Sequence, residues 1–312
     1  MEYEDLTYDG VDMSTVKFFP ILADLSVASK QHKLPPEDSW KAPQNEGSER
    51  KDNYVKGVEQ AKWGTGVESA DGVVNYFGTQ DPQSYHASTA STMTKTYKKF
   101  ISTMLSAVEY AFNIWKATFK FSGLKINGPV AVGSTGCLKS DQKFFDLFKT
   151  YPGHVEFMTG KHYAKWRDAV GKGVEKCLNK YFDNVMVPAL PWYPAFAAFP
   201  GPVAPPMPNI PWPLISCPST GLTDITTSAP IKKAILDEFD DGVAEKNHDD
   251  IHETIFEAIA SSLSIGFLTW VSTQFINLVM ANGNIPTFAP PVVPVGPVVN
   301  GQNIATPGHI AL

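Results

Sequence analysis

The sequence predicts a mainly α protein: three long amphipathic helices, each followed by an extended proline-rich arm, behind a largely irregular N-terminal arm. Apolar residues recur at helical spacing in three long windows. Proline-rich runs follow these windows, and residues 184–223 and 258–312 contain no Asp, Glu, Lys or Arg. Solvated loops normally carry charge, so charge-free stretches of this length predict burial against the chain itself or against partners.

Residues 1–90 are predicted to form an extended polar arm. Residues 24–52 are rich in Lys, Glu, Pro, Asn and Ser and contain clear helix breakers. Two apolar clusters interrupt the arm, and we interpret them as anchor points: Phe18, Phe19, Ile21 and Leu22, and then Val73, Val74, Tyr76 and Phe77.

The three helices are expected at about 91–120, 161–185 and 249–280, with a shorter helical piece at 231–239. Trp115, Trp166 and Trp270 each lie on the apolar stripe of one long helix. Helix-plus-arm segments are therefore drawn at 91–160, 161–228 and 229–312.

An internal repeat is indicated by motifs that recur in the same order behind these helices. Phe112-x-x-Trp115 matches Phe267-x-x-Trp270, and Val185-Met186 matches Val279-Met280. Each segment then reaches Gly-Pro-Val followed by a small apolar residue, at 128–131, 201–204 and 296–299. The alternative is a simple bias toward proline and valine.

The arms are interpreted as polyproline II segments, because proline fixes φ and lacks a backbone donor. A stiff, charge-free, aromatic-rich segment suits docking onto a neighbouring subunit, although it could equally cover its own helix. The residues expected at such an interface are Trp192, Tyr193, Phe196, Phe199, Trp212, Phe288, Val292, Val295, Val298 and Ile304.

Net charge and cysteine content exclude some function classes. A net charge of −6 without clustered Lys and Arg argues against nucleic-acid binding. Cys137, Cys177 and Cys217 form no CxxC pair, which fits reduced and partly buried thiols and leaves disulfide formation open. The N-terminus is acidic and polar, so we expect no secretory signal peptide and synthesis in a cytoplasm.

Catalytic and metal-binding motifs are weak, and we expect a protein that is not an enzyme and holds no metal or cofactor. His248 and His252 lie four residues apart, as in zinc enzymes with an HExxH motif, but Asp249 replaces the glutamate. A metal-dependent enzyme that uses these two histidines is therefore an alternative hypothesis.

A membrane-active protein is the other alternative. Residues 258–281 contain no charge and are long enough to span a bilayer. Serines and threonines along this stretch, and the absence of Lys or Arg at its flanks, favour a buried helix in a protein assembly instead.

The chain resembles virion structural proteins of tailed bacteriophages in its long polar N-terminal arm and its proline-rich segments at 187–214 and 286–312. The likeness covers about a third of the chain and includes no diagnostic motif. It implies a capsid decoration, neck, tail or baseplate component, assembled in a host cytoplasm as a homo-oligomer with other structural proteins.

Overall fold

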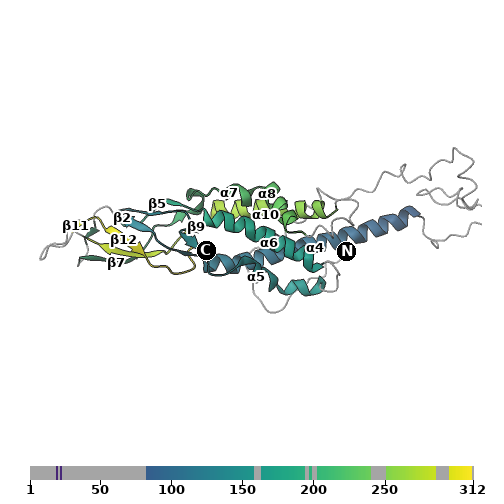
Figure 1. Ribbon diagram of the computed structural model, residues 1–312, viewed down its shortest axis with the longest axis horizontal. Helices are drawn as coiled ribbons and strands as arrows, with labels where there is room; N and C mark the ends of the chain where they lie inside the picture. Colours follow the sequence, from purple (N-terminus) through teal and green to yellow (C-terminus); the bar gives the residue numbers. More distant parts are fainter. Residues whose placement is uncertain are drawn as a thin grey trace, which may run out of the picture. The chain divides into compact units, whose positions relative to one another are not determined.

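The computed structural model describes residues 82–157, 163–193, 197–198, 202–239, 251–285 and 295–310, together with Phe19 and Leu22. The chain divides into two compact units, Met1–Ser26 with Ile101–Leu312, and Val27–Phe100. Of the second unit, the described residues are those of the first part of helix α4 (Pro82–Thr118). The first unit contains the six-stranded sheet and the helices described below (Figure 1).

The described residues form six α-helices. After α4 come α5 (Phe144–Lys149), α6 (Tyr163–Asp183), α7 (Leu222–Thr226), α8 (Ser228–Asp237) and α10 (Ile251–Thr273). Two short 3-10 helices are η2 (Pro152–Phe157) and η3 (Leu214–Ser216). Helices α6 and α10 both pack against α7 and α8, and α5 packs against α6.

Close packing of α6 on α8 requires a glycine. A Cβ atom on Gly173 would lie 2.6 Å from the Cα atom of Ile235, which is nearer than real Cβ contacts come. The backbones of the two helices are therefore in direct contact at this point.

The three long helices share an aromatic core near their C-terminal ends. The ring of Phe182 on α6 stacks on Phe119 at 4.1 Å, and it also contacts Trp115 and Trp270. Phe112 on α4 meets Phe267 and Trp270 of α10 edge to face. Aromatic pairs of this kind add about 0.5–1.5 kcal/mol each beyond the area that they bury.

Beyond the helices lies an antiparallel sheet of six strands in the order β5-β3-β2-β12-β10-β7 (Figure 1). The strands are β2 (Lys125–Asn127), β3 (Val130–Gly133), β5 (Val187–Pro191), β7 (Val203–Pro208), β10 (Met280–Asn284) and β12 (Val299–Asn303). Three two-stranded sheets accompany it: β1 (Lys120–Phe121) with β4 (Leu138–Lys139), β6 (Ala197–Ala198) with β11 (Val295–Gly296), and β8 (Trp212–Pro213) with β9 (Phe275–Ile276).

The six strands belong to three consecutive parts of the chain, and each part contains one long helix and two strands. Two strands of the sheet follow each long helix: β2 and β3 follow α4, β5 and β7 follow α6, and β10 and β12 follow α10. We call the first strand of each part ascending and the second descending. Each descending strand pairs with the ascending strand of the next part, in the pairs β3–β5, β7–β10 and β12–β2. Within the first and third parts the two strands also pair with each other, β2 with β3 and β10 with β12, so all three parts share one sheet.

The edge strands β5 and β7 carry no ladder between them, yet they lie close together. The indole Nε1 of Trp192, directly after β5, donates to the carbonyl oxygen of Met207 in β7 at 3.0 Å. The hydroxyl of Tyr193 lies 2.5 Å from the Ala281 oxygen and 3.2 Å from the Pro205 oxygen. These side chains nearly close the sheet into a barrel.

The predicted fold class is wrong, because the described residues form six helices and a six-stranded antiparallel sheet, and the described proline-rich segments after α6 are strands of that sheet. Prolines in a sheet are confined to strands that need few backbone donors, above all edge strands. Pro188 and Pro191 lie in β5, and Pro205, Pro206 and Pro208 lie in β7, which are the two edge strands. The structure also has three short helices, α5, α7 and α8, of which the sequence indicated only the last.

The recurring motifs fall at corresponding places in the sheet. The Gly-Pro-Val segments lead into β3, β7 and β12, the three descending strands. Gly123 and Leu278, each five residues beyond the end of its helix, both have positive φ, at 75° and 57°. Leu278 thus adopts the backbone conformation that glycine adopts in the first part. The domain boundaries drawn from the sequence stay predictions.

Candidate interaction surface

The cysteines and His154, His252 and His309 are buried. No group of three or more His, Cys, Asp or Glu residues is arranged to hold a metal ion among the described residues. His252 stacks on the ring of Phe239 at 5.4 Å and is 7% exposed. It lies among aromatic side chains, and His248 falls outside the described residues.

The three cysteines are free and buried. Burial raises the pKa of Cys137 and Cys177 to about 11 and that of Cys217 to about 12. Because the thiolate is the nucleophile and metal ligand, thiols with such pKa values are unreactive near neutral pH. All three cysteines therefore act as small apolar residues in the core.

Two buried histidines have both ring nitrogens satisfied. His154 Nε2 lies 2.9 Å from the Phe148 carbonyl oxygen and its Nδ1 lies 2.8 Å from the Tyr163 hydroxyl. His309 Nδ1 lies 3.1 Å from the Asn277 carbonyl oxygen, and its Nε2 lies 2.9 Å from the Thr306 hydroxyl. Burial lowers the pKa of both histidines, so both are neutral parts of the folded structure.

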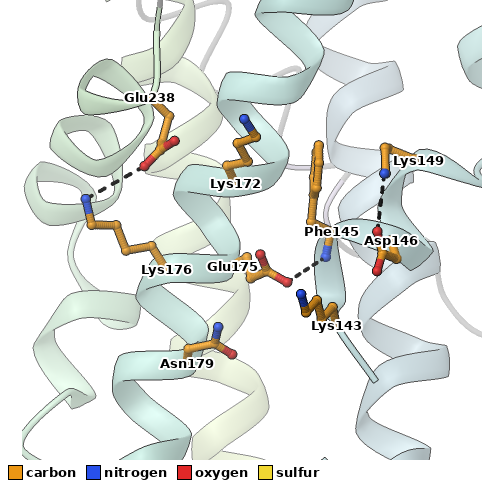
Figure 2. A pocket seen from close by; sticks show the side chains of 9 residues that line it. All are labelled: Lys143, Phe145, Asp146, Lys149, Lys172, Glu175, Lys176, Asn179 and Glu238. Carbon is orange, nitrogen blue, oxygen red and sulfur yellow. Dashed lines mark hydrogen bonds and ion pairs between the residues drawn. The ribbon is translucent and has the colours of Figure 1, made fainter. Parts of the chain in front are cut away.

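A surface hollow of about 640 Å³ lies between α5 and α6, close to the end of α8 (Figure 2). Most of its charges are engaged within the chain. Glu175 Oε1 accepts a hydrogen bond from the backbone N–H of Phe145 at 3.0 Å. Two ion pairs join Lys149 Nζ to Asp146 Oδ1 at 3.2 Å and Lys176 Nζ to Glu238 Oε1 at 3.9 Å. Lys149 also covers the Phe145 ring at 4.7 Å. This arrangement attaches α5 to α6, and it has no buried catalytic acid or base.

The predicted interface residues separate into several environments. Trp192, Tyr193 and Val298 are almost fully buried in the chain's own core. Trp212 is half-buried in β8, and its Nε1 finds no acceptor among the described residues. Ile304 is exposed. Val295 forms a backbone pair with Ala198, whereas Phe196, Phe199, Phe288 and Val292 lie outside the described residues.

Several exposed or half-buried apolar side chains lie in or next to the paired strands β8 and β9. Trp212 pairs with Ile276 and Pro213 with Phe275. Asn209 continues this pairing toward Val279, because its backbone N–H donates to the Val279 oxygen at 3.0 Å. Ile210 and Leu278 are therefore opposite one another, and their exposed fractions are 55% and 60%. We call Ile210, Trp212, Ile215, Phe275 and Leu278 the β8–β9 patch.

Asn209 holds the two segments of the patch together. It is 5% exposed, its side-chain N–H groups donate to the oxygens of Ile210 and Ile276, and its Oδ1 accepts from the Val279 N–H. A buried amide that satisfies both sides of a pairing costs little and fixes their register. Asn209 therefore fixes the register of the two segments that carry the patch.

The outer face of the six-stranded sheet is also poor in charge. Lys125 is the single ionisable residue in the six strands. Val132 and Val203 are half exposed, while the alternating positions Ala131 and Ala204 are buried. Sequence reasoning found the charge-free stretches but missed which residues face outward, because the strand register that decides it depends on pairing between distant segments.

Helix α10 is the one described helix long and apolar enough to cross a membrane. The candidate span is His252–Thr273, with a mean hydropathy of 1.4, and 61% of that window is buried inside the protein. The helix ends at Thr273, so the proposed span at 258–281 includes strands β9 and the start of β10.

Comparisons with known proteins give no relative for this chain. No family model matches it, and no significant match was found among curated proteins or solved structures.

Proposed function

We propose that this protein is a non-enzymatic structural subunit that assembles with copies of itself and with other structural proteins. The observation that carries the proposal is the β8–β9 patch, where apolar side chains are exposed on two charge-free segments whose register Asn209 fixes. Exposed apolar groups that cluster in this way mark protein–protein contacts more often than scattered ones do. The core of an interface is typically depleted in charge, as this surface is.

The buried state of the reactive groups supports the same proposal. In the described residues, the cysteines, His154, His252 and His309 all serve packing or internal hydrogen bonds. We extend the proposal to a virion component, assembled in a host cytoplasm, on the resemblance of the sequence alone.

The surface that we propose for the contact differs from the one that the sequence predicted on the proline-rich arms. Trp192, Tyr193 and Val298 are covered by the chain itself, so they leave little area for a partner. We assign the contact to Ile210, Phe275 and Leu278, whose side chains are open to solvent.

The test is the native mass of the purified chain and of a triple variant, Ile210→Lys, Phe275→Lys and Leu278→Lys. We expect the unaltered chain to form a defined oligomer and the variant to lose this oligomer while its far-UV circular dichroism spectrum is unchanged. Thr223→Lys, at an exposed position of α7, is the control and should assemble normally. An oligomer of unchanged mass in the triple variant would exclude the patch as the contact.

A further inference from the structure

Phe19 occupies a notch on α10 that exists because residue 266 is glycine. A Cβ atom at Gly266 would lie 1.7 Å from Cε1 of Phe19, and its three nearest atoms all belong to the Phe19 ring. The ring also meets Phe267 edge to face at 5.3 Å, and Phe19 is 5% exposed. Glycine in the middle of a helix is unfavourable, so its presence here requires a compensating contact.

The notch continues a line of small residues on α10. Ala258, Ser262 and Gly266 follow one another at intervals of four, which places them on one face of the helix. Ala258 and Ser262 are both 1% exposed. Phe19 is the large side chain that fills the glycine end of this face.

The connection of Phe19 to the rest of the chain is unusual. Met1–Ser26 belongs to the same compact unit as α10, but the chain then leaves that unit and returns to it only at Ile101. The residues that join Leu22 to the start of α4 are 23–81, a length that could extend roughly 200 Å. The notch can therefore receive the same contact from the Phe19 of another copy of the chain.

We propose that the Gly266 notch is a docking site for the Phe19 segment of a second copy, so that neighbouring subunits in the assembly exchange their N-terminal anchors. Exchange preserves every contact of the closed form, which makes it a low-cost route to association between identical chains. This inference rests on the proposed structural role, but it uses a surface separate from the β8–β9 patch.

Complementation between two variants tests the exchange. Phe19→Ala has an open notch and no anchor, whereas Gly266→Ala has an anchor and a notch that its Cβ atom fills. We expect neither variant to associate with itself through the notch. A mixture of the two, carrying different tags, should give a mixed species whose cross-links join residues near Phe19 of one copy to α10 of the other.

The control is the double variant Phe19→Ala/Gly266→Ala, which has neither the Phe19 ring nor an open notch and should not pair with Phe19→Ala. The proposal is overturned if the mixture shows no more cross-linking than this control. A second measurement does not depend on the folding of Gly266→Ala: a peptide of residues 14–26 should bind the Phe19→Ala chain at least tenfold more tightly than the same peptide with alanine at position 19. Equal binding of the two peptides would also overturn it.

Repeating the mixing experiment in the triple-lysine background separates the two proposals. Exchange that persists there, although the native oligomer is lost, supports the notch independently of the patch. Loss of mixed cross-links in that background would contradict an independent docking site.

Discussion

At the scale of single residues, Leu278 carries an unusual backbone conformation. Its φ of 57° lies in the left-handed region, which costs an L-residue other than Gly, Asn or Asp roughly 1–2 kcal/mol. The corresponding position after α4 is Gly123, which adopts that conformation without a Cβ penalty. The third part of the fold therefore retains strain that the first part lacks.

We expect Leu278→Gly to stabilise the fold by up to about 1 kcal/mol, because relief of strain exceeds the added entropy of glycine in the unfolded chain. Little packing is lost, since 60% of the side chain is exposed. Urea denaturation would measure the change. Leu278→Ala is the control, because it shortens the side chain but keeps the strain. An equal gain in both variants would attribute the effect to the exposed side chain.

The two buried histidines predict acid sensitivity. Well above the unfolded pKa of about 6.5, His154 and His309 are neutral in both the folded and the unfolded chain, so they add no pH dependence. As the pH falls below that value, the unfolded chain gains protons that the folded chain does not, because burial lowers both folded pKa values. Stability therefore decreases until the pH reaches the folded pKa values and levels off below them.

We expect a lower free energy of unfolding at about pH 5.5 than at about pH 7.5. His154→Gln and His309→Gln should each reduce this difference, because each removes one site that takes up a proton on unfolding. Denaturation curves at the two pH values provide the measurement. A difference that is unchanged in both variants would assign the acid sensitivity to other groups.

At the scale of elements, the near-closure of the sheet depends on two side-chain donors and one backbone hydrogen bond, from the Ile210 N–H to the Pro191 oxygen at 3.0 Å. β5 and β7 are proline-rich and cannot form a full ladder with each other. Trp192 and Tyr193 supply side-chain donors across the gap, where few backbone N–H groups are available. The remaining neighbours in the sheet are joined by backbone pairs.

We expect Tyr193→Phe to destabilise the fold by about 1–2 kcal/mol, because a buried carbonyl loses its donor. Hydrogen exchange should increase in β5 and β7 more than in β2 and β12. Tyr110→Phe is the matched control, since the Tyr110 ring packs against Tyr151 on the helical side of the unit. Hydrogen exchange that increases equally in all six strands would contradict a local effect of Tyr193 on β5 and β7.

The helices were more predictable than the strands for a physical reason. Helical periodicity is local, and the sequence placed the third helix to begin near residue 249, close to the Ile251 of α10. The pairing of β2 with β12 joins Ile126 to Gly301, and no local pattern contains that information. The exposed members of the patch, such as Phe275, were missed because their exposure follows from another distant pairing, that of β8 with β9.

At the scale of the whole molecule, the apolar surface of α10 is used inside the protein. Phe256, Ile259 and Leu263 are fully buried, and among the exposed residues of this helix are Ile265 and Leu268. An apolar helix that is mostly covered gains little by transfer into lipid, because its apolar area is already out of water.

We therefore expect the intact folded chain to remain unbound in a liposome flotation assay. If it floats, the variant Ile265→Lys/Leu268→Lys decides the cause. Flotation abolished by these substitutions would show that α10 inserts and would contradict a purely structural role. Chain denatured before mixing is the positive control for lipid binding.

The cyclic strand order also bears on how the polypeptide is made. Synthesis yields β2 and β3 early, yet the partner of β2 on its other side is β12, which is made much later. The sheet cannot be completed until β12 has been synthesised, and pairings between such distant residues form slowly. Premature termination before residue 299 would leave β2 with an unsatisfied edge, so incomplete products should be prone to aggregation and degradation.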